Sequence, residues 1–216
     1  MSRSRTPDDP TPQVRPFPVD PAALRWEEAE ATLIGILVDD LRAAAEPIPT
    51  LLAFARDRAL AIVGLRPFGP GEVDQALLEV LALLVPLGAD RLAFAATGRV
   101  WSLDDPIVPV CDAGDLRQRA LVITVADGHD PARPLRGAIH PFEGDGDELT
   151  FLPPVAADQV PGGPAATLLE GAVAERHALI TLAQEHDLVA QLGRVLLLGH
   201  DLALAPDAAA ELATVR

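Results

Sequence analysis

The segment 88–125 constrains the fold most, because it holds two strand-like runs joined by a long loop that contains prolines. The first run, Asp90–Ser102, has an apolar face and a mixed face. The second run, Arg119–Ala126, contains LVITV, which is apolar and β-branched on both faces. Such a run is typical of a strand in the middle of a sheet with helices over it. The pair therefore predicts the centre of a sheet that the other apolar segments cover.

A strand and a helix are predicted just before this pair. Arg58–Arg66 has the composition of a strand, and Glu72–Val85 has apolar residues at helical spacing. Together with the run from Asp90, the order strand, helix, strand predicts a βαβ unit. If its two strands share one sheet, they are parallel and the crossover is right-handed.

Two shorter strands are predicted after the central pair. Leu135–Phe142 and Glu148–Leu152 flank the turn residues Gly144–Asp147, which is the pattern of an antiparallel hairpin. The expected fold class is therefore α/β (α+β), with a mixed sheet of about five strands. An N-terminal helix and a C-terminal helical segment would cover this sheet.

The N-terminal helix is predicted to begin at Asp20-Pro21, where Asp20 caps it and Pro21 takes the first helical position. Pro47 and Pro49 would end it. Its apolar stripe is expected to consist of Leu24, Ala31, Ile34, Val38 and Leu41. A long C-terminal helix is predicted from Ala165 to about Leu192, and a short one from Pro206.

Composition divides the chain into four segments. Residues 1–19 form a proline-rich arm expected to be disordered, and residues 20–153 form the α/β domain with the mixed sheet. Residues 154–164 read as a proline and glycine linker, and 165–216 as the helical C-terminal segment. That segment either packs on its own sheet or pairs with its copy in a homodimer.

Residue usage excludes several kinds of chemistry. Lysine, asparagine and tyrosine are absent, which suggests a high-GC bacterial genome and rules out a Schiff-base or P-loop lysine. Cys111 is the only cysteine, so the chain has no internal disulfide. With no signal-like apolar segment and no run of about 20 apolar residues, we expect a cytoplasmic protein without membrane contact.

The charge is strongly acidic, with 32 acidic residues against 17 arginines and a formal net charge of −15. Such a surface repels phosphate backbones, so nucleic acid is not an expected partner. Dinucleotide-fold, nucleophile-elbow and calcium-loop signatures are also missing from the sequence, so no cofactor is expected.

His140 and Glu143 are the first candidates for chemistry, because they follow each other closely at the end of a predicted strand. They suit a metal site or an acid–base pair. Asp112, Asp115 or His129 would have to lie nearby. The simpler interpretation is a surface histidine and glutamate that flank a turn.

Cys111 is a weaker catalytic candidate. The neighbouring Asp112 and Asp115 would raise the pKa of its thiol and make it a poor nucleophile, which favours a structural cysteine. Trp101, in the first central strand, and His186, on the apolar face of the long C-terminal helix, are candidate interface residues.

These observations favour a non-enzymatic module for protein interaction or self-association, with a protein partner or a second copy as its ligand. One alternative is a hydrolase-like enzyme, with or without an assisting metal ion, centred on His140 and Glu143. Another is a small-ligand sensor that uses the open end of the sheet. The alternatives differ in whether His129, His140, Glu143 and Asp112 converge in one pocket.

Overall fold

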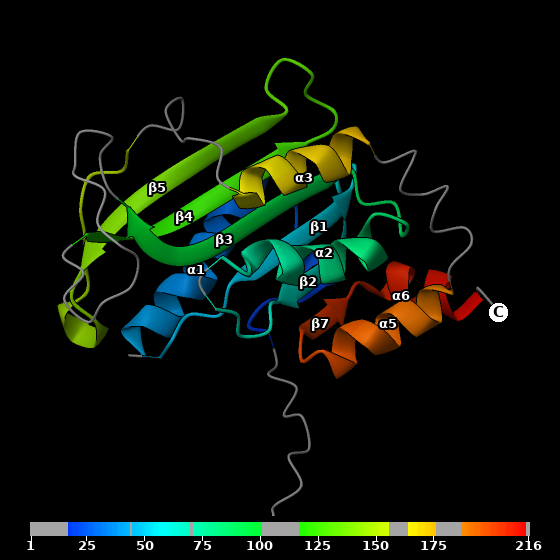
Figure 1. Ribbon diagram of the computed structural model, residues 1–216, viewed down its shortest axis with the longest axis horizontal. Coiled ribbons are helices and arrows are strands. Elements are labelled where there is room, and N and C mark those ends of the chain that lie inside the picture. The colour runs from blue at the N-terminus through cyan, green and yellow to red at the C-terminus, as the bar shows by residue number, and fades with distance from the viewer. Residues whose placement is uncertain are drawn as a thin grey trace, which may run out of the picture.

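The computed structural model describes residues 17–43, 45–69, 71–100, 117–155, 164–175 and 187–214. Within these ranges the chain forms one seven-stranded sheet in the order β6-β5-β4-β3-β1-β2-β7 (Figure 1). Its strands are β1 (Thr50–Ala55), β2 (Arg58–Gly64), β3 (Arg91–Val100), β4 (Gln118–Asp127), β5 (Leu135–Glu143), β6 (Thr150–Phe151) and β7 (Asp201–Leu204).

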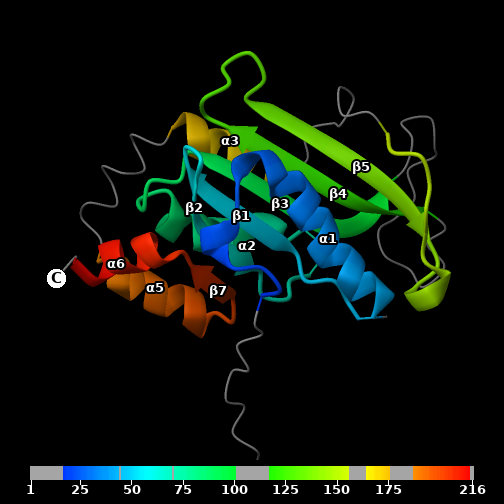
Figure 2. The same cartoon turned by 180° about the vertical axis from the view of Figure 1, so that it is seen from behind.

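Helices cover both faces of this sheet. The α-helices are α1 (Ala29–Arg42), α2 (Val73–Leu84), α3 (Pro164–Ala174), α5 (Leu188–Leu197) and α6 (Pro206–Thr214). The short 3-10 turns are η1 (Pro21–Ala23), η2 (Trp26–Glu28) and η3 (Gly146–Glu148). Figure 2 shows α1 lying across one face, and Figure 1 shows α2, α3 and α5 on the opposite face. The predicted α+β class is confirmed.

The central pair predicted from residues 88–125 is β3 and β4, which run antiparallel through ten residue pairs from Arg91↔Asp127 to Val100↔Gln118. Residues of β4 alternate between the two helical layers. Leu121 and Ile123 pack in the cluster under α1, whereas Ala126 belongs to the cluster under α2 and α3. The two-sided apolar character of LVITV therefore reflects burial on both faces.

The predicted βαβ unit is present in a split form. β2 and β3 are parallel to each other, but β1 lies between them and pairs antiparallel with both. Every pair of adjacent strands in the described residues is consequently antiparallel. The sheet therefore has seven strands and is antiparallel, whereas a mixed sheet of about five strands was expected. The prediction was wrong on these two points because it left out β1 and β7.

The hairpin that joins β1 to β2 explains why β1 was missed. Its turn is Arg56-Asp57, without the glycine, asparagine or proline that usually signals a turn. Arg56 takes a left-handed conformation with a φ of 57°. Its backbone N–H donates a hydrogen bond of 2.6 Å to Asp90 Oδ1, so a distant carboxylate stabilises the turn.

The N-terminal helix differs from its prediction in start and register. Asp20 accepts a hydrogen bond from the Ala22 N–H and Pro21 takes the first position, but this turn ends at Ala23 and α1 begins only at Ala29. The fully buried residues of α1 include Leu33 and Leu37 rather than the expected Ala31 and Ile34.

Other expectations fall partly outside the described residues. Most of the arm and of the linker, and the candidates Trp101, Cys111 and His186, lie there. At the inner end of the arm, Phe17 and Val19 pack against the cluster under α1. Among the helices that the structure describes, none has both the length and the apolar character needed to cross a membrane.

The register of α1 predicts which of two adjacent residues holds the core together. We expect Leu33→Ala to lower the free energy of unfolding by about 2–5 kcal/mol, since Leu33 is completely buried. Ile34→Ala should cost clearly less because Ile34 is only partly buried. Urea unfolding followed by circular dichroism measures both values, and the reverse order would show that α1 is rotated from this position.

Candidate functional site

The structure does not bring His140 and Glu143 together. Both lie on β5, where His140 is opposite Leu121 of β4 and Glu143 is opposite Thr150 of β6. Side chains alternate between the two faces along a strand, so residues three apart point to opposite faces of the sheet. The pair therefore cannot share one substrate or one metal ion from these positions.

His129 is remote from this pair. It follows the end of β4, about 20 Å along the strand from the level of His140. Cys111, Asp112 and Asp115 lie outside the described residues. Within the ranges that are described, His, Cys, Asp and Glu side chains nowhere form a group of three or more that could hold a metal ion.

His129 belongs instead to a polar cluster beside the β1–β2 turn. Its Nε2 lies 2.9 Å from Oδ2 of Asp90, a carboxylate that is almost fully buried. A histidine oriented by a buried carboxylate resembles part of a catalytic triad. Here, however, the second oxygen of Asp90 holds the Arg56 amide, so the carboxylate fixes the turn as well as the ring.

Asp127 is the centre of the same cluster. Its carboxylate accepts hydrogen bonds from Trp26 Nε1–H at 3.2 Å, Arg91 Nε–H at 2.9 Å and the His129 N–H at 2.9 Å. Burial by itself would raise the pKa of Asp127, but these hydrogen bonds and the Arg91 charge outweigh it and lower the pKa. Arg91 also binds Asp57 in the turn.

Two arginines enclose Trp26 in this cluster. The guanidinium carbons of Arg91 and Arg136 lie 5.3 and 5.6 Å from the centre of the indole ring, and Phe54 meets the ring edge-on. Arg136 is held in turn by Glu30 of α1 at 2.8 Å. The cluster thus joins η2, α1, β1, β3, β4 and β5, which is the arrangement of a structural anchor.

A second buried network joins α2 to the chain just before β7. Glu79 of α2 accepts from Arg66 Nε–H at 2.8 Å and Arg66 Nη2–H at 3.0 Å, which is a bidentate ion pair. His200 Nε2 lies 2.9 Å from the same carboxylate. The Arg66 backbone N–H donates to His200 Nδ1 at 3.2 Å, so Nδ1 is the acceptor and Nε2 carries the proton.

This network perturbs both titrating groups. Hydrogen bonding by Arg66, with a further contribution from His200, lowers the pKa of Glu79 to about 2 although burial opposes the shift. Burial lowers the pKa of His200 and outweighs the attraction of Glu79. A neutral histidine is therefore held between a backbone amide and a paired carboxylate, with both ring nitrogens in use, and this favours a structural role.

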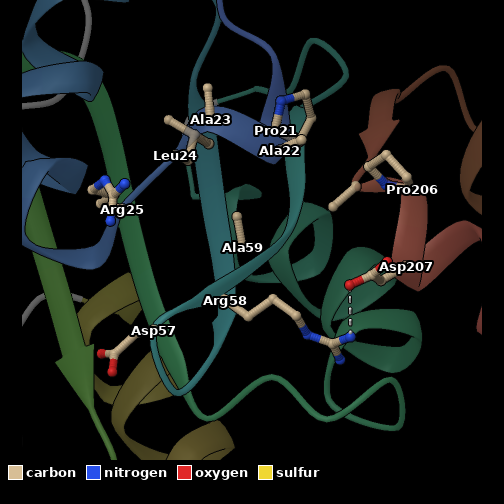
Figure 3. A pocket seen from close by; sticks show the side chains of 11 residues that line it. Pro21, Ala22, Ala23, Leu24, Arg25, Asp57, Arg58, Ala59, Pro206 and Asp207 are labelled. Atoms are coloured by element: carbon tan, nitrogen blue, oxygen red, sulfur yellow. Dashed lines mark hydrogen bonds and ion pairs between the residues drawn. The ribbon is translucent and has the colours of Figure 1, made fainter.

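A surface cleft of about 370 Å³ lies between η1, the β1–β2 turn and the start of α6 (Figure 3). Its lining residues are Pro21, Ala22, Ala23, Leu24, Arg25, Asp57, Arg58, Ala59, Ala205, Pro206 and Asp207. Arg58 reaches across to Asp207 at 3.5 Å, and Asp57 is held by Arg91. Apart from Arg25, the charged side chains of its wall are thus held in ion pairs.

Three of the exposed large apolar side chains in the described part of the chain lie on α5. Val189, Leu196 and Leu197 are 49%, 47% and 89% exposed, respectively. At 100° per residue they fall on one side of the helix together with Gly193. An adjoining side packs on the core through Leu188, Leu192 and Val195. We call Val189, Gly193, Leu196 and Leu197 the α5 stripe.

The helices on this face of the sheet contain few charged residues. α3 and α5 each contain one charged residue, and α2 contains two, of which Glu79 is internally paired. By contrast, α1 on the other face of the sheet has four charged residues among its 14. Sequence reasoning singled out His186 just before α5 but not the stripe itself, although the run LVAQLGRVLLL contains only one charge.

Comparison with known proteins gives no further guide to the site. No protein-family model matches the chain, and no curated protein or solved structure is significantly similar to it.

The Glu79 network predicts a specific dependence of stability on pH. A carboxyl whose pKa falls on folding stabilises the protein fully above its unfolded value, here 4.5, and loses that contribution as the pH falls towards 2. We expect Glu79→Gln to lower the free energy of unfolding by roughly 3 kcal/mol at pH 7. The difference from the wild type should shrink steadily between pH 4.5 and pH 2.

Urea unfolding at several pH values measures this difference. Glu211→Gln makes the same chemical change at an exposed position of α6 and should have little effect at any pH. A Glu79→Gln difference that stays constant with pH would contradict the assigned ion pair.

Proposed function

We propose that this chain is a non-enzymatic protein-interaction module that binds its partner through the α5 stripe. The observation that carries the proposal is Leu197, a leucine with 89% of its surface exposed on a helix that is attached to the core through Leu188, Leu192 and Val195. A single exposed leucine is ordinary, but neighbouring apolar side chains on one helical face mark interaction sites.

The distribution of charge supports this proposal. The chain has a formal net charge of −15, and a solvated helix such as α1 carries its share of charged residues. The only charged residue of α5 is Arg194. The centres of protein interfaces are poor in charged side chains, so this composition fits a surface that another protein covers.

The alternatives receive less support from the geometry. An enzyme centred on His140 and Glu143 would need both side chains on one face of β5, and they lie on opposite faces. A small-ligand sensor could use the cleft of Figure 3, but the ion pair between Arg58 and Asp207 already occupies two of its charged groups.

Photo-crosslinking in cells tests the proposed interface. We expect a photoreactive phenylalanine analogue at Val189 to yield a defined covalent adduct with another polypeptide chain. The same analogue at Ala31, an exposed position on α1, should yield none. Adding Leu197→Glu to the Val189 variant should abolish the adduct, because a carboxylate in an apolar interface is strongly disfavoured.

Circular dichroism and urea unfolding would establish that Leu197→Glu leaves the fold intact, as expected for so exposed a side chain. Equal labelling from Val189 and Ala31, or an adduct that survives Leu197→Glu, would overturn the proposal.

A further inference from the structure

His200 is a buried polar contact between the last part of the described chain and the rest of the fold. α5, β7 and α6, residues 188–214, lie at the β2 edge of the sheet (Figure 1), and we call them the C-terminal unit. The His200 side chain joins this unit to Glu79 of α2 and to Arg66 after β2. We propose that protonation of His200 releases the C-terminal unit from these two partners, so that this part of the chain opens in acid while the central sheet stays folded. Such a release acts on the attachment of α5 and is independent of what binds to its exposed side.

The hydrogen bonds of His200 require a neutral ring. Nδ1 accepts the Arg66 backbone N–H at 3.2 Å, so this nitrogen carries no proton of its own. Nε2 lies 2.9 Å from Oε2 of Glu79 and donates to it. A second proton must therefore go onto Nδ1, where it would face the Arg66 N–H. Because two donors do not form a hydrogen bond with each other, the protonated ring loses its contact with the end of β2.

The charges around the ring also oppose protonation. Glu79 and Arg66 form a bidentate ion pair whose two charges cancel. A proton on His200 would give this group of three a net positive charge, at a side chain with no exposed surface. Glu79 and Asp201 of β7 attract the proton and Arg66 repels it, and the one charged residue of α5 is Arg194. Burial outweighs the two carboxylates, so the pKa of His200 is lowered.

The place of the C-terminal unit in the fold favours a local release. β7 is the outermost strand beside β2, so its separation leaves the order of the other six strands intact. It pairs with β2 over only four residues. Gly199, directly before His200, has a φ of 89°, and glycine can change this angle at little cost. Parts of a protein with few stabilising contacts open before the whole fold does.

The expected pH range follows from the direction of the pKa shift. A histidine whose pKa falls on folding supports the closed form fully above its ordinary value, here 6.5, and opposes it increasingly as the pH falls below that value. The population of the open form should therefore rise by up to about tenfold for each pH unit below 6.5, until the lowered pKa is reached.

Hydrogen exchange of the full-length chain, followed by NMR from about pH 7 to about pH 5, tests this inference. The amides to follow are Arg66, which donates to His200, and Ala205, which donates to the Leu60 carbonyl at 2.8 Å. After division by the intrinsic exchange rate at each pH, opening at both amides should increase by up to about tenfold per pH unit. The amide of Thr124, in the β3–β4 ladder, should show no such increase.

His200→Gln separates the ring from other titrating groups. Glutamine offers one acceptor and two donors in its side chain and does not titrate, so it can bind the Arg66 N–H and Glu79 at every pH. We expect opening at Arg66 and Ala205 to become independent of pH in this variant. His129→Gln, the matched change at a partly exposed histidine, should keep the wild-type dependence.

The wild-type profile decides the question even if His200→Gln fails to fold. Opening at Arg66 and Ala205 that stays constant with pH would overturn the inference. A parallel rise at Thr124 would do the same, because it would show that the whole sheet unfolds and not the C-terminal unit alone. If His200→Gln folds and keeps the wild-type dependence, another group is responsible and His200 is not the switch.

Discussion

The ladder between β3 and β4 is the interaction on which the rest of the structure depends. Both strands are long and apolar, and β4 presents apolar side chains to both faces. A sheet of this kind is stable only if each face is covered, so helices are required on both sides. α1 covers one face, and α2, α3 and α5 cover the other.

Polar contacts then fix how these layers are attached. Asp127, at the end of β4, binds Trp26 of η2 and Arg91 of β3, which orients the segment leading into α1. Glu79 binds Arg66 and His200, which ties α2 to the region between α5 and β7. Because buried charges without partners are costly, each network specifies one arrangement of the elements that it joins.

The fold was predictable where the signal was local. The runs that became β3, β4 and β5 and the periodicity of α2 identified their elements to within a few residues. β1 was missed because its turn, Arg56-Asp57, depends on a hydrogen bond that the Arg56 N–H donates to Asp90, which lies 34 positions further along the chain. The strand β7 has four residues, too few for a periodic pattern.

The candidate site was less predictable, for a related reason. The spacing of His140 and Glu143 suggested a pair, but it did not show that a strand would turn them to opposite faces. The buried network of Arg66, Glu79 and His200 joins residues far apart in sequence, and no local pattern indicates it. The exposure of α5 depends on what packs over it, which sequence periodicity does not report.

The buried contacts of His200 have a consequence for the surface of α5. His200 lies three residues after Leu197, and its ring is bonded on both sides to groups from other parts of the fold. The hydrogen bonds of His200 therefore hold in place the backbone that follows the exposed leucines at the end of α5. A partner that binds to these leucines would immobilise their side chains but would not have to order the backbone. Such preorganisation reduces the conformational entropy that is lost on association.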